Sequence, residues 1–173
     1  MSGFGLLSGL LLGLLVLLWV ARWSIRRGLA APREAEKRDP DSLGLVFRTV
    51  AFPTANGRTL RGWFIPAQQA VAPAVVLLHG WGGNAETMLP LAGPLHRQGH
   101  AVLLFDTRCH GMSDGDSFAS LPRFAEDLDH ALDWLRTQPG VDPQRIAVIG
   151  HSVGAGAALL AASRSAAIAA VVS

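Results

Sequence analysis

The 173-residue sequence predicts an α/β fold in which helices cover both faces of a mostly parallel sheet. One observation is that short, continuous apolar runs, such as residues 74–79 and 101–105, are typical of strands buried on both faces. Another is that such runs alternate with stretches of helical spacing, the order that connects parallel strands. The composition agrees: half of the residues are hydrophobic and 16% are charged, which excludes a disordered chain.

The body of the chain begins with an expected antiparallel hairpin. Residues 45–53 and 59–66 are short runs rich in β-branched and aromatic side chains, and the Asn56-Gly57 pair between them is a strong turn signal. The buried run at residues 74–79 is followed by a glycine-rich turn and then by a helix expected over residues 85–98. Two prolines in this helix predict an irregular course.

The second half continues the alternation of strand and helix. The strand at residues 101–105 leads into a long polar loop, after which apolar residues recur at steps of three and four from Leu121 to Leu135. This spacing predicts an amphipathic helix with Ser120 as its N-cap. The remaining expected elements are a strand at residues 146–149, a helix of small residues at 153–164 and a buried strand at 168–172.

The amino-terminal stretch predicts a membrane anchor. Residues 3–21 carry no charge and include nine leucines, and as a helix they would span about 28 Å, close to the ~30 Å hydrocarbon core of a bilayer. A cleavable signal peptide would carry positive charge before the apolar run, whereas Arg22, Arg26 and Arg27 follow it. We therefore expect a retained single-pass transmembrane helix in the lipid bilayer, with the body on the cytoplasmic side.

Residues 22–42 are polar and basic and are predicted to be a linker between the anchor and the body. Residues 22–38 hold six Lys or Arg and two Asp or Glu, whereas residues 39–173 hold nine and eleven. The formal net charge of +2 therefore comes from a basic segment beside a mildly acidic body. Such a distribution does not fit a nucleic-acid surface, and no nucleic-acid partner is expected.

The most informative segment is residues 150–154, Gly-His-Ser-Val-Gly, between an expected strand and an expected helix. A nucleophile on such a turn needs a strained backbone with little room around it, which Gly150 and Gly154 provide. The helix terminus that follows favours negative charge. Ser152 is therefore the candidate nucleophile, although the same pentapeptide also arises by chance in glycine-rich sequences.

A second segment, residues 79–84, reads His-Gly-Trp-Gly-Gly-Asn after the first buried strand. In acyl transfer, backbone N–H groups that are held in place beforehand stabilise the oxyanion. The turn at Gly80 can present the N–H of Trp81, and Val153, which follows the candidate nucleophile, supplies a second donor. For His79 we expect a structural hydrogen bond in the turn and no catalytic role.

A third segment, residues 106–113, ends the next strand with Asp-Thr-Arg-Cys-His-Gly-Met-Ser. Asp106 is expected either to cap this loop or to hold Arg108. His110 lies near two aspartates, but the later glycine and glutamate of a calcium loop are missing, and Cys109 is the only cysteine. The sequence therefore predicts no metal site and implies no cofactor.

Together the three motifs resemble the α/β-hydrolase superfamily, and residues 131–135 and 141–146 are similar to stretches in its bacterial serine hydrolases. The resemblance covers residues 45–173, so residues 43–173 are expected to be the amino-terminal part of an α/β-hydrolase domain. It implies Ser152 as nucleophile and the amides of Trp81 and Val153 as oxyanion hole. Similar membrane-anchored members are esterase- or peptidase-like, which implies a small-molecule or peptide acyl substrate. The oligomeric state stays open.

The acid and the histidine that follow the serine in this superfamily are missing. None of the twenty-one residues after Ser152 is Asp, Glu or His, and all six histidines precede it. We therefore expect an incomplete α/β-hydrolase fold, truncated at its carboxyl end. We expect this chain to be inactive by itself, because without a base the serine hydroxyl stays protonated.

Two other classes of function stay open. Residues 80–85 match the G-x-G-x-x-A pattern before an expected helix, and Asp106 follows about twenty residues later, where a dinucleotide-binding acid would hold the ribose. A membrane-tethered binding module that kept the fold and lost the chemistry would also explain the missing acid and histidine. Labelling of Ser152 by a fluorophosphonate in the full-length protein would favour the hydrolase over dinucleotide binding, and the sequence beyond residue 173 would test the non-catalytic module.

Overall fold

The computed structural model describes residues 3–28, 30–165 and 168–173. It divides into two compact units, residues 1–30 and 31–173. The first unit holds helix α1 (Gly3–Gly28), which continues past the predicted end of the apolar run at residue 21. In the described part of the chain, one stretch, Leu7–Ile25 within α1, is long and apolar enough to cross a membrane.

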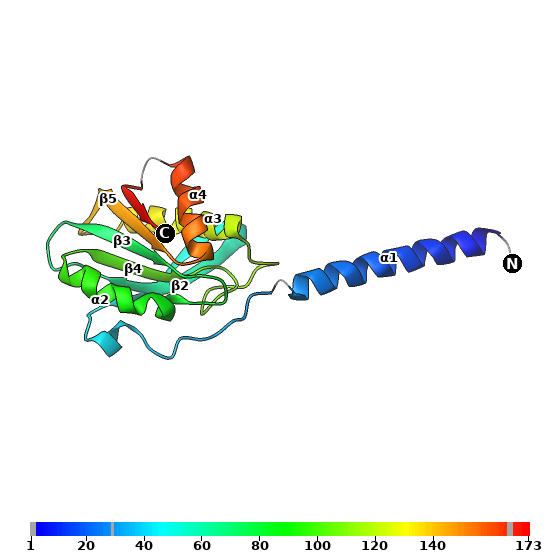
Figure 1. The fold of residues 1–173 in the computed structure, drawn as a ribbon, viewed down its shortest axis with the longest axis horizontal. Coiled ribbons are helices and arrows are strands. Elements are labelled where there is room, and N and C mark those ends of the chain that lie inside the picture. The colour runs from blue at the N-terminus through cyan, green and yellow to red at the C-terminus, as the bar shows by residue number, and fades with distance from the viewer. Residues whose placement is uncertain (1–2, 29, 166–167) are drawn as a thin grey trace. The chain divides into compact units, whose positions relative to one another are not determined.

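The second unit is built on a six-stranded sheet with the order β1-β2-β4-β3-β5-β6 among the described residues (Figure 1). Its first two strands form the expected antiparallel hairpin, and β2 also pairs antiparallel with β4. The pairs β3–β4, β3–β5 and β5–β6 are parallel, which confirms the mostly parallel sheet. The strands are β1 (Arg48–Thr54), β2 (Arg58–Ile65), β3 (Ala72–Leu78), β4 (Ala101–Asp106), β5 (Val141–Gly150) and β6 (Ala170–Val172).

Helices cover both faces of the sheet, as predicted (Figure 1). Helix α2 (Leu89–Arg97) and the preceding 3-10 helix η3 (Ala85–Met88) cover one face, and α3 (Leu121–Arg136) and α4 (Val153–Arg164) cover the other. Successive side chains of a strand point to opposite faces. On β3, Val75 accordingly packs in the α2 core, and Val76 packs in the core under α3 and α4. This explains the continuous apolar runs.

Three local expectations differ from the structure. The helix expected at residues 85–98 divides into η3 and α2. Pro90 has no N–H with which to continue a helix from η3, and it stands instead in the first turn of α2, where a missing N–H costs nothing. Ser120 occupies the N-cap position of α3, but its side chain makes no capping hydrogen bond. Strand β6 was expected to be buried, yet Ala170 is exposed and Val172 is 56% exposed.

The predicted linker also differs in part. Residues 31–38, which we call the strap, belong to the same compact unit as the body and bind it through several polar contacts. The chain then forms the 3-10 helix η1 (Pro40–Leu43), whose N-cap Asp39 accepts a hydrogen bond from the Asp41 amide at 3.0 Å. This part of the segment is therefore ordered on the body.

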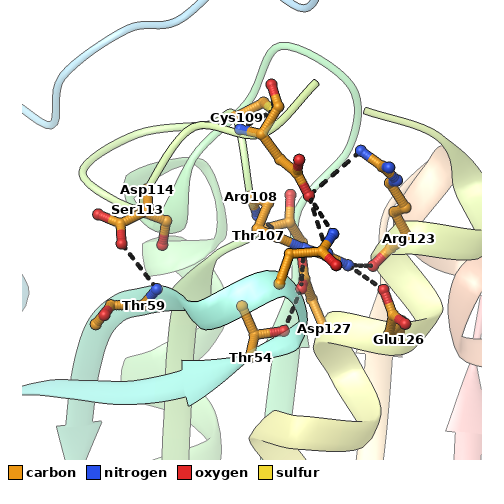
Figure 2. Close-up of polar contacts among 12 residues, drawn as sticks. Thr54, Thr59, Thr107, Arg108, Cys109, Ser113, Asp114, Arg123, Glu126 and Asp127 are labelled. Atoms are coloured by element: carbon orange, nitrogen blue, oxygen red, sulfur yellow. Dashed lines mark hydrogen bonds and ion pairs between the residues drawn. The ribbon is translucent and has the colours of Figure 1, made fainter. Parts of the chain in front are cut away.

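A buried ion pair joins the loop after β4 to helix α3 (Figure 2). Arg108 is 2% exposed, and its Nε donates to Asp127 Oδ1 at 2.7 Å. The same carboxylate accepts the Arg108 amide at 2.8 Å and the Thr54 hydroxyl at 2.7 Å, so that it links this loop, α3 and the end of β1. Arg108 also pairs with Glu126 and with Asp116. Of the two roles expected for Asp106, holding Arg108 is wrong, because Asp127 takes this role.

Removing one partner of this pair is expected to destabilise the fold strongly. Asp127→Ala removes the buried carboxylate that binds Arg108 Nε, and because Asp116 and Glu126 still pair with the guanidinium, the loss of unfolding free energy is expected to be at most about 3–5 kcal/mol. The exposed Asp133 pairs with Arg136 on the same helix, and Asp133→Ala is expected to cost less than about 1 kcal/mol. Urea unfolding followed by circular dichroism measures both values. Equal losses in the two variants would contradict the importance of the Arg108–Asp127 pair.

Candidate active site

Ser152 stands on the turn between β5 and α4 in a conformation that non-glycine residues rarely adopt. Its φ is 54° and its ψ is −118°, outside the main allowed regions. Ser152 is exposed, and its hydroxyl makes no capping hydrogen bond to α4. The turn is held by the His151 amide, which donates to the Leu78 carbonyl at 2.9 Å. The serine is thus presented at the carboxyl edge of the sheet.

Glycines allow the backbones around Ser152 to approach one another closely. A Cβ on Gly150 would lie 2.6 Å from the Ala155 Cα, and a Cβ on Gly154 would collide with the carbonyl oxygens of Leu78 and His79. A side chain at either position would therefore push α4 away from the sheet. This is the lack of room that the sequence pattern predicted.

The glycine-rich loop after β3 lies directly beside the serine. A Cβ on Gly80 would lie 3.1 Å from the Cβ of Ser152. The Gly80 carbonyl accepts hydrogen bonds from His79 Nδ1 at 2.8 Å and from the Gly83 amide at 3.0 Å. In a trans peptide the C=O and N–H groups point in opposite directions. These two bonds therefore also fix the direction of the Trp81 N–H.

Among the described residues, no acceptor binds either of the two candidate oxyanion donors. In the described part of the chain, neither the amide of Trp81 nor that of Val153 donates a hydrogen bond. Val153 begins α4, where amides of the first turn have no partner within the helix. Both amides are therefore free to bind a negatively charged oxygen.

His79 makes the structural hydrogen bonds that the sequence predicts. It is fully buried, its Nδ1 donates to Gly80, and its Nε2 accepts the Thr107 amide at 3.1 Å. Burial lowers the pKa of His79 to about 3, against the raising effect of the Gly80 bond. The imidazole is therefore neutral at physiological pH and links the loops after β3 and β4.

Asp106 caps its loop and ties it to η3. One carboxyl oxygen accepts the Ala85 amide at 2.7 Å and the other accepts the Met112 amide at 2.8 Å. The residue is 1% exposed, so its carboxyl is not presented to a ribose as a dinucleotide site requires. Burial, together with a hydrogen bond to Glu36 of the strap, raises the pKa of Asp106 to about 8.

The rest of this loop is structural as well. Cys109 has a φ of 68°, and its sulfur accepts the Asp116 amide at 3.2 Å.

In the part of the chain that the structure describes, no three His, Cys, Asp or Glu side chains are grouped as metal ligands. No described histidine ring makes a hydrogen bond to Ser152.

Sequence reasoning missed His110, which it weighed only as a metal ligand. This residue is fully buried, its ring centroid lies 5.9 Å from that of Trp81, and its Nε2 has no hydrogen-bond partner among the described residues. Burial lowers the pKa of His110. No sequence pattern predicts the contact between His110 and Trp81, because it depends on how the loops after β3 and β4 pack together.

The stability of the body is expected to depend on pH through Asp106. An acid whose pKa is raised in the folded state binds more protons there than when unfolded, so stability falls as pH rises from about 4 and levels off above about 8. One proton contributes at most about 1.4 kcal/mol per pH unit. Asp106→Asn should reduce this slope, and Asp133→Asn should keep it. Urea unfolding at pH 5 to 9 measures it, and an unchanged slope in Asp106→Asn would contradict the assignment.

Several curated proteins are similar to this chain in sequence. A polyketide transferase of Aspergillus fumigatus, af380, is 39% identical over 116 residues, which are 65% of this chain and 39% of that protein. The thiohydrolase apmlB of Arthrinium phaeospermum is 37% identical over 116 residues, 65% of this chain and 38% of that protein. The chain therefore spans about two fifths of the length of these curated relatives.

Solved structures are similar to the body in the same way. The α/β hydrolase GrgF of Penicillium has a TM-score of 0.69 at 34% identity, covering 73% of this chain and 45% of that one. The Pyrococcus furiosus esterase Pf2001 has a TM-score of 0.75 at 29% identity, covering 83% and 54%. The family model described as serine aminopeptidase, S33, matches residues 69–173. The chain thus belongs to the serine aminopeptidase S33 family of the α/β-hydrolase superfamily.

Proposed function

We propose that the protein to which this chain belongs is a serine hydrolase that cleaves or transfers ester, thioester or peptide-type acyl groups. Ser152 is the nucleophile, and the amides of Trp81 and Val153 form the oxyanion hole. The observation that carries the proposal is the strained backbone of Ser152, with its hydroxyl exposed and unused for capping. Strain of this kind persists where the surrounding structure imposes it, and it is concentrated at functional sites.

In the proposed reaction the Ser152 hydroxyl attacks the acyl carbon and its proton passes to a base. The carbonyl oxygen becomes negatively charged and is stabilised by the two backbone amides, which need no rearrangement. The start of α4 adds the partial positive charge of a helix N-terminus. His79 contributes indirectly, because its bond to Gly80 orients the Trp81 peptide.

In the chain order of the superfamily, the acid and the histidine follow the nucleophile. We propose that they lie after residue 173. A serine without a base is a weak nucleophile. Residues 1–173 are therefore proposed to carry the nucleophile and the oxyanion hole, and the following sequence to carry the activating pair. Two of the relatives are a thiohydrolase and a polyketide transferase, which supports thioester or ester substrates over peptides.

Fluorophosphonate labelling tests the nucleophile. The natural protein that includes the sequence after residue 173 is expected to be labelled, Ser152→Ala is not, and residues 1–173 alone are labelled at least about 10³-fold more slowly. Ser163→Ala, on the exposed face of the same helix, is the matched control and keeps the wild-type rate. Labelling that survives in Ser152→Ala would refute the proposed nucleophile. No labelling of the wild type would favour the non-catalytic module.

We also propose that α1 anchors the protein in a lipid bilayer with the body in the cytoplasm. The apolar stretch Leu7–Ile25 and the arginines at its end support this topology. The wild type should stay in the membrane pellet after alkaline carbonate extraction. Leu11→Arg combined with Leu15→Arg should release it, because each charge costs about 2.5–3.5 kcal/mol at the helix centre. Gly13→Leu should stay in the pellet, and release of the wild type would contradict the anchor.

A further inference from the structure

The strap runs between two loops that border the candidate active site. Pro32 lies against the glycine-rich loop, where its Cδ would be 3.3 Å from a Cβ on Gly82. The next residue, Arg33, turns to the other loop, and its Nε donates to the Gly111 carbonyl at 2.9 Å. The carbonyl of Glu34 returns to the first loop and accepts from Asn84 Nδ2 at 3.1 Å. Successive strap residues thus hold the two loops alternately.

Both of these loops reach the proposed oxyanion hole. Gly82 directly follows Trp81, whose amide is one of the proposed donors. The ring of Trp81 meets that of His110 edge to face at 5.9 Å, and His110 directly precedes Gly111. A displacement of the loop that Arg33 holds would therefore be transmitted to the indole and the peptide of Trp81.

We propose that Arg33 is a positioning residue for the acyl transfer. Its guanidinium holds the loop after β4 so that the Trp81 amide faces the oxyanion formed at Ser152. This inference rests on the proposed function. It assigns a role in the site to a residue that lies before the part of the chain matched by the family model, residues 69–173.

The chemistry of the contact explains why arginine serves this position. Besides the bond from Nε to Gly111, the Nη2 of Arg33 donates to the Ser113 carbonyl. A planar guanidinium can reach two carbonyls in this way, whereas the ammonium of lysine is a point charge without a fixed fork. Hydrogen bonds from a charged donor are stronger than those between neutral groups.

Loss of Arg33 is expected to loosen the loop without unfolding it. The loop keeps the Met112 amide and the Ser113 hydroxyl bonded to Asp106 at 2.8 and 2.6 Å. The strap itself stays attached farther along, because Glu86 accepts the Lys37 amide at 2.6 Å and Arg38 Nε at 2.9 Å. These same bonds lower the pKa of Glu86, which keeps it ionised.

The test compares strap variants of the natural protein that contains the sequence after residue 173, purified in detergent. The readouts are kcat and KM for p-nitrophenyl butyrate, the rate of fluorophosphonate labelling, and amide hydrogen exchange at residues 107–114. Arg33→Ala should lower kcat and the labelling rate about tenfold, because small displacements of oxyanion donors are costly. KM should change less than twofold, and exchange in the loop should rise.

Two further variants sharpen the result. Arg33→Lys should recover only part of the lost kcat, and guanidinium ion at millimolar concentration should partly rescue Arg33→Ala. Lys37→Ala is the matched control, because it removes a strap charge while its backbone bond to Glu86 stays, and it should keep the wild-type values. A wild type that is labelled while Arg33→Ala reacts at the same rate would refute the role of Arg33 alone. A wild type that is never labelled would refute the proposed function and, with it, this inference.

Discussion

The close approach of α4 to the end of β3 is the constraint on which the candidate site depends. Gly154 leaves no space for a side chain against the carbonyls of Leu78 and His79. The chain must therefore leave β5 and enter α4 within a very short turn, which places Ser152 at a φ of 54°. Strain of this kind costs about 1–3 kcal/mol. It is offset by the small residues of α4, which are fully buried: Ala157, Ala158 and Ala161.

His79 and Asp106, two buried polar residues near the carboxyl edge of the sheet, respond differently to pH. His79 holds the Gly80 peptide, and its pKa of about 3 keeps it neutral, so that this support of the Trp81 amide does not titrate in the physiological range. Asp106 joins η3, the loop after β4 and the strap, and its pKa of about 8 lies near that range. The support that His79 gives to the Gly80–Trp81 peptide is thus independent of pH in this range, whereas the loop after β4 is held by a group that can change its charge.

Patterns that are local in sequence predicted most of the fold and the strained turn at Ser152. The hairpin, the buried strands β3 and β4 and the bounds of α4 follow from residue periodicity and turn residues. The strap could not be found in this way, because Arg33 bonds residues 78 and 80 positions away. The partner of Arg108 was uncertain for the same reason. Asp106 is close in sequence, but Asp127, on the next helix, has the right place in the fold.

The spacing of the glycines after β3 fits both a dinucleotide site and an oxyanion loop, and the burial of Asp106 distinguishes the two interpretations. A dinucleotide fingerprint needs an acid that faces the ligand, whereas both Asp106 oxygens accept backbone amides in the interior. Folded chains satisfy their buried polar groups internally. Among the described residues, the exposed Ser152 and the amides of Trp81 and Val153 have no internal hydrogen-bond partner in this turn region and are available to a ligand. An exposed serine on a strained turn next to the Gly80 loop suits attack on an acyl group, and the dinucleotide interpretation leaves this serine unexplained.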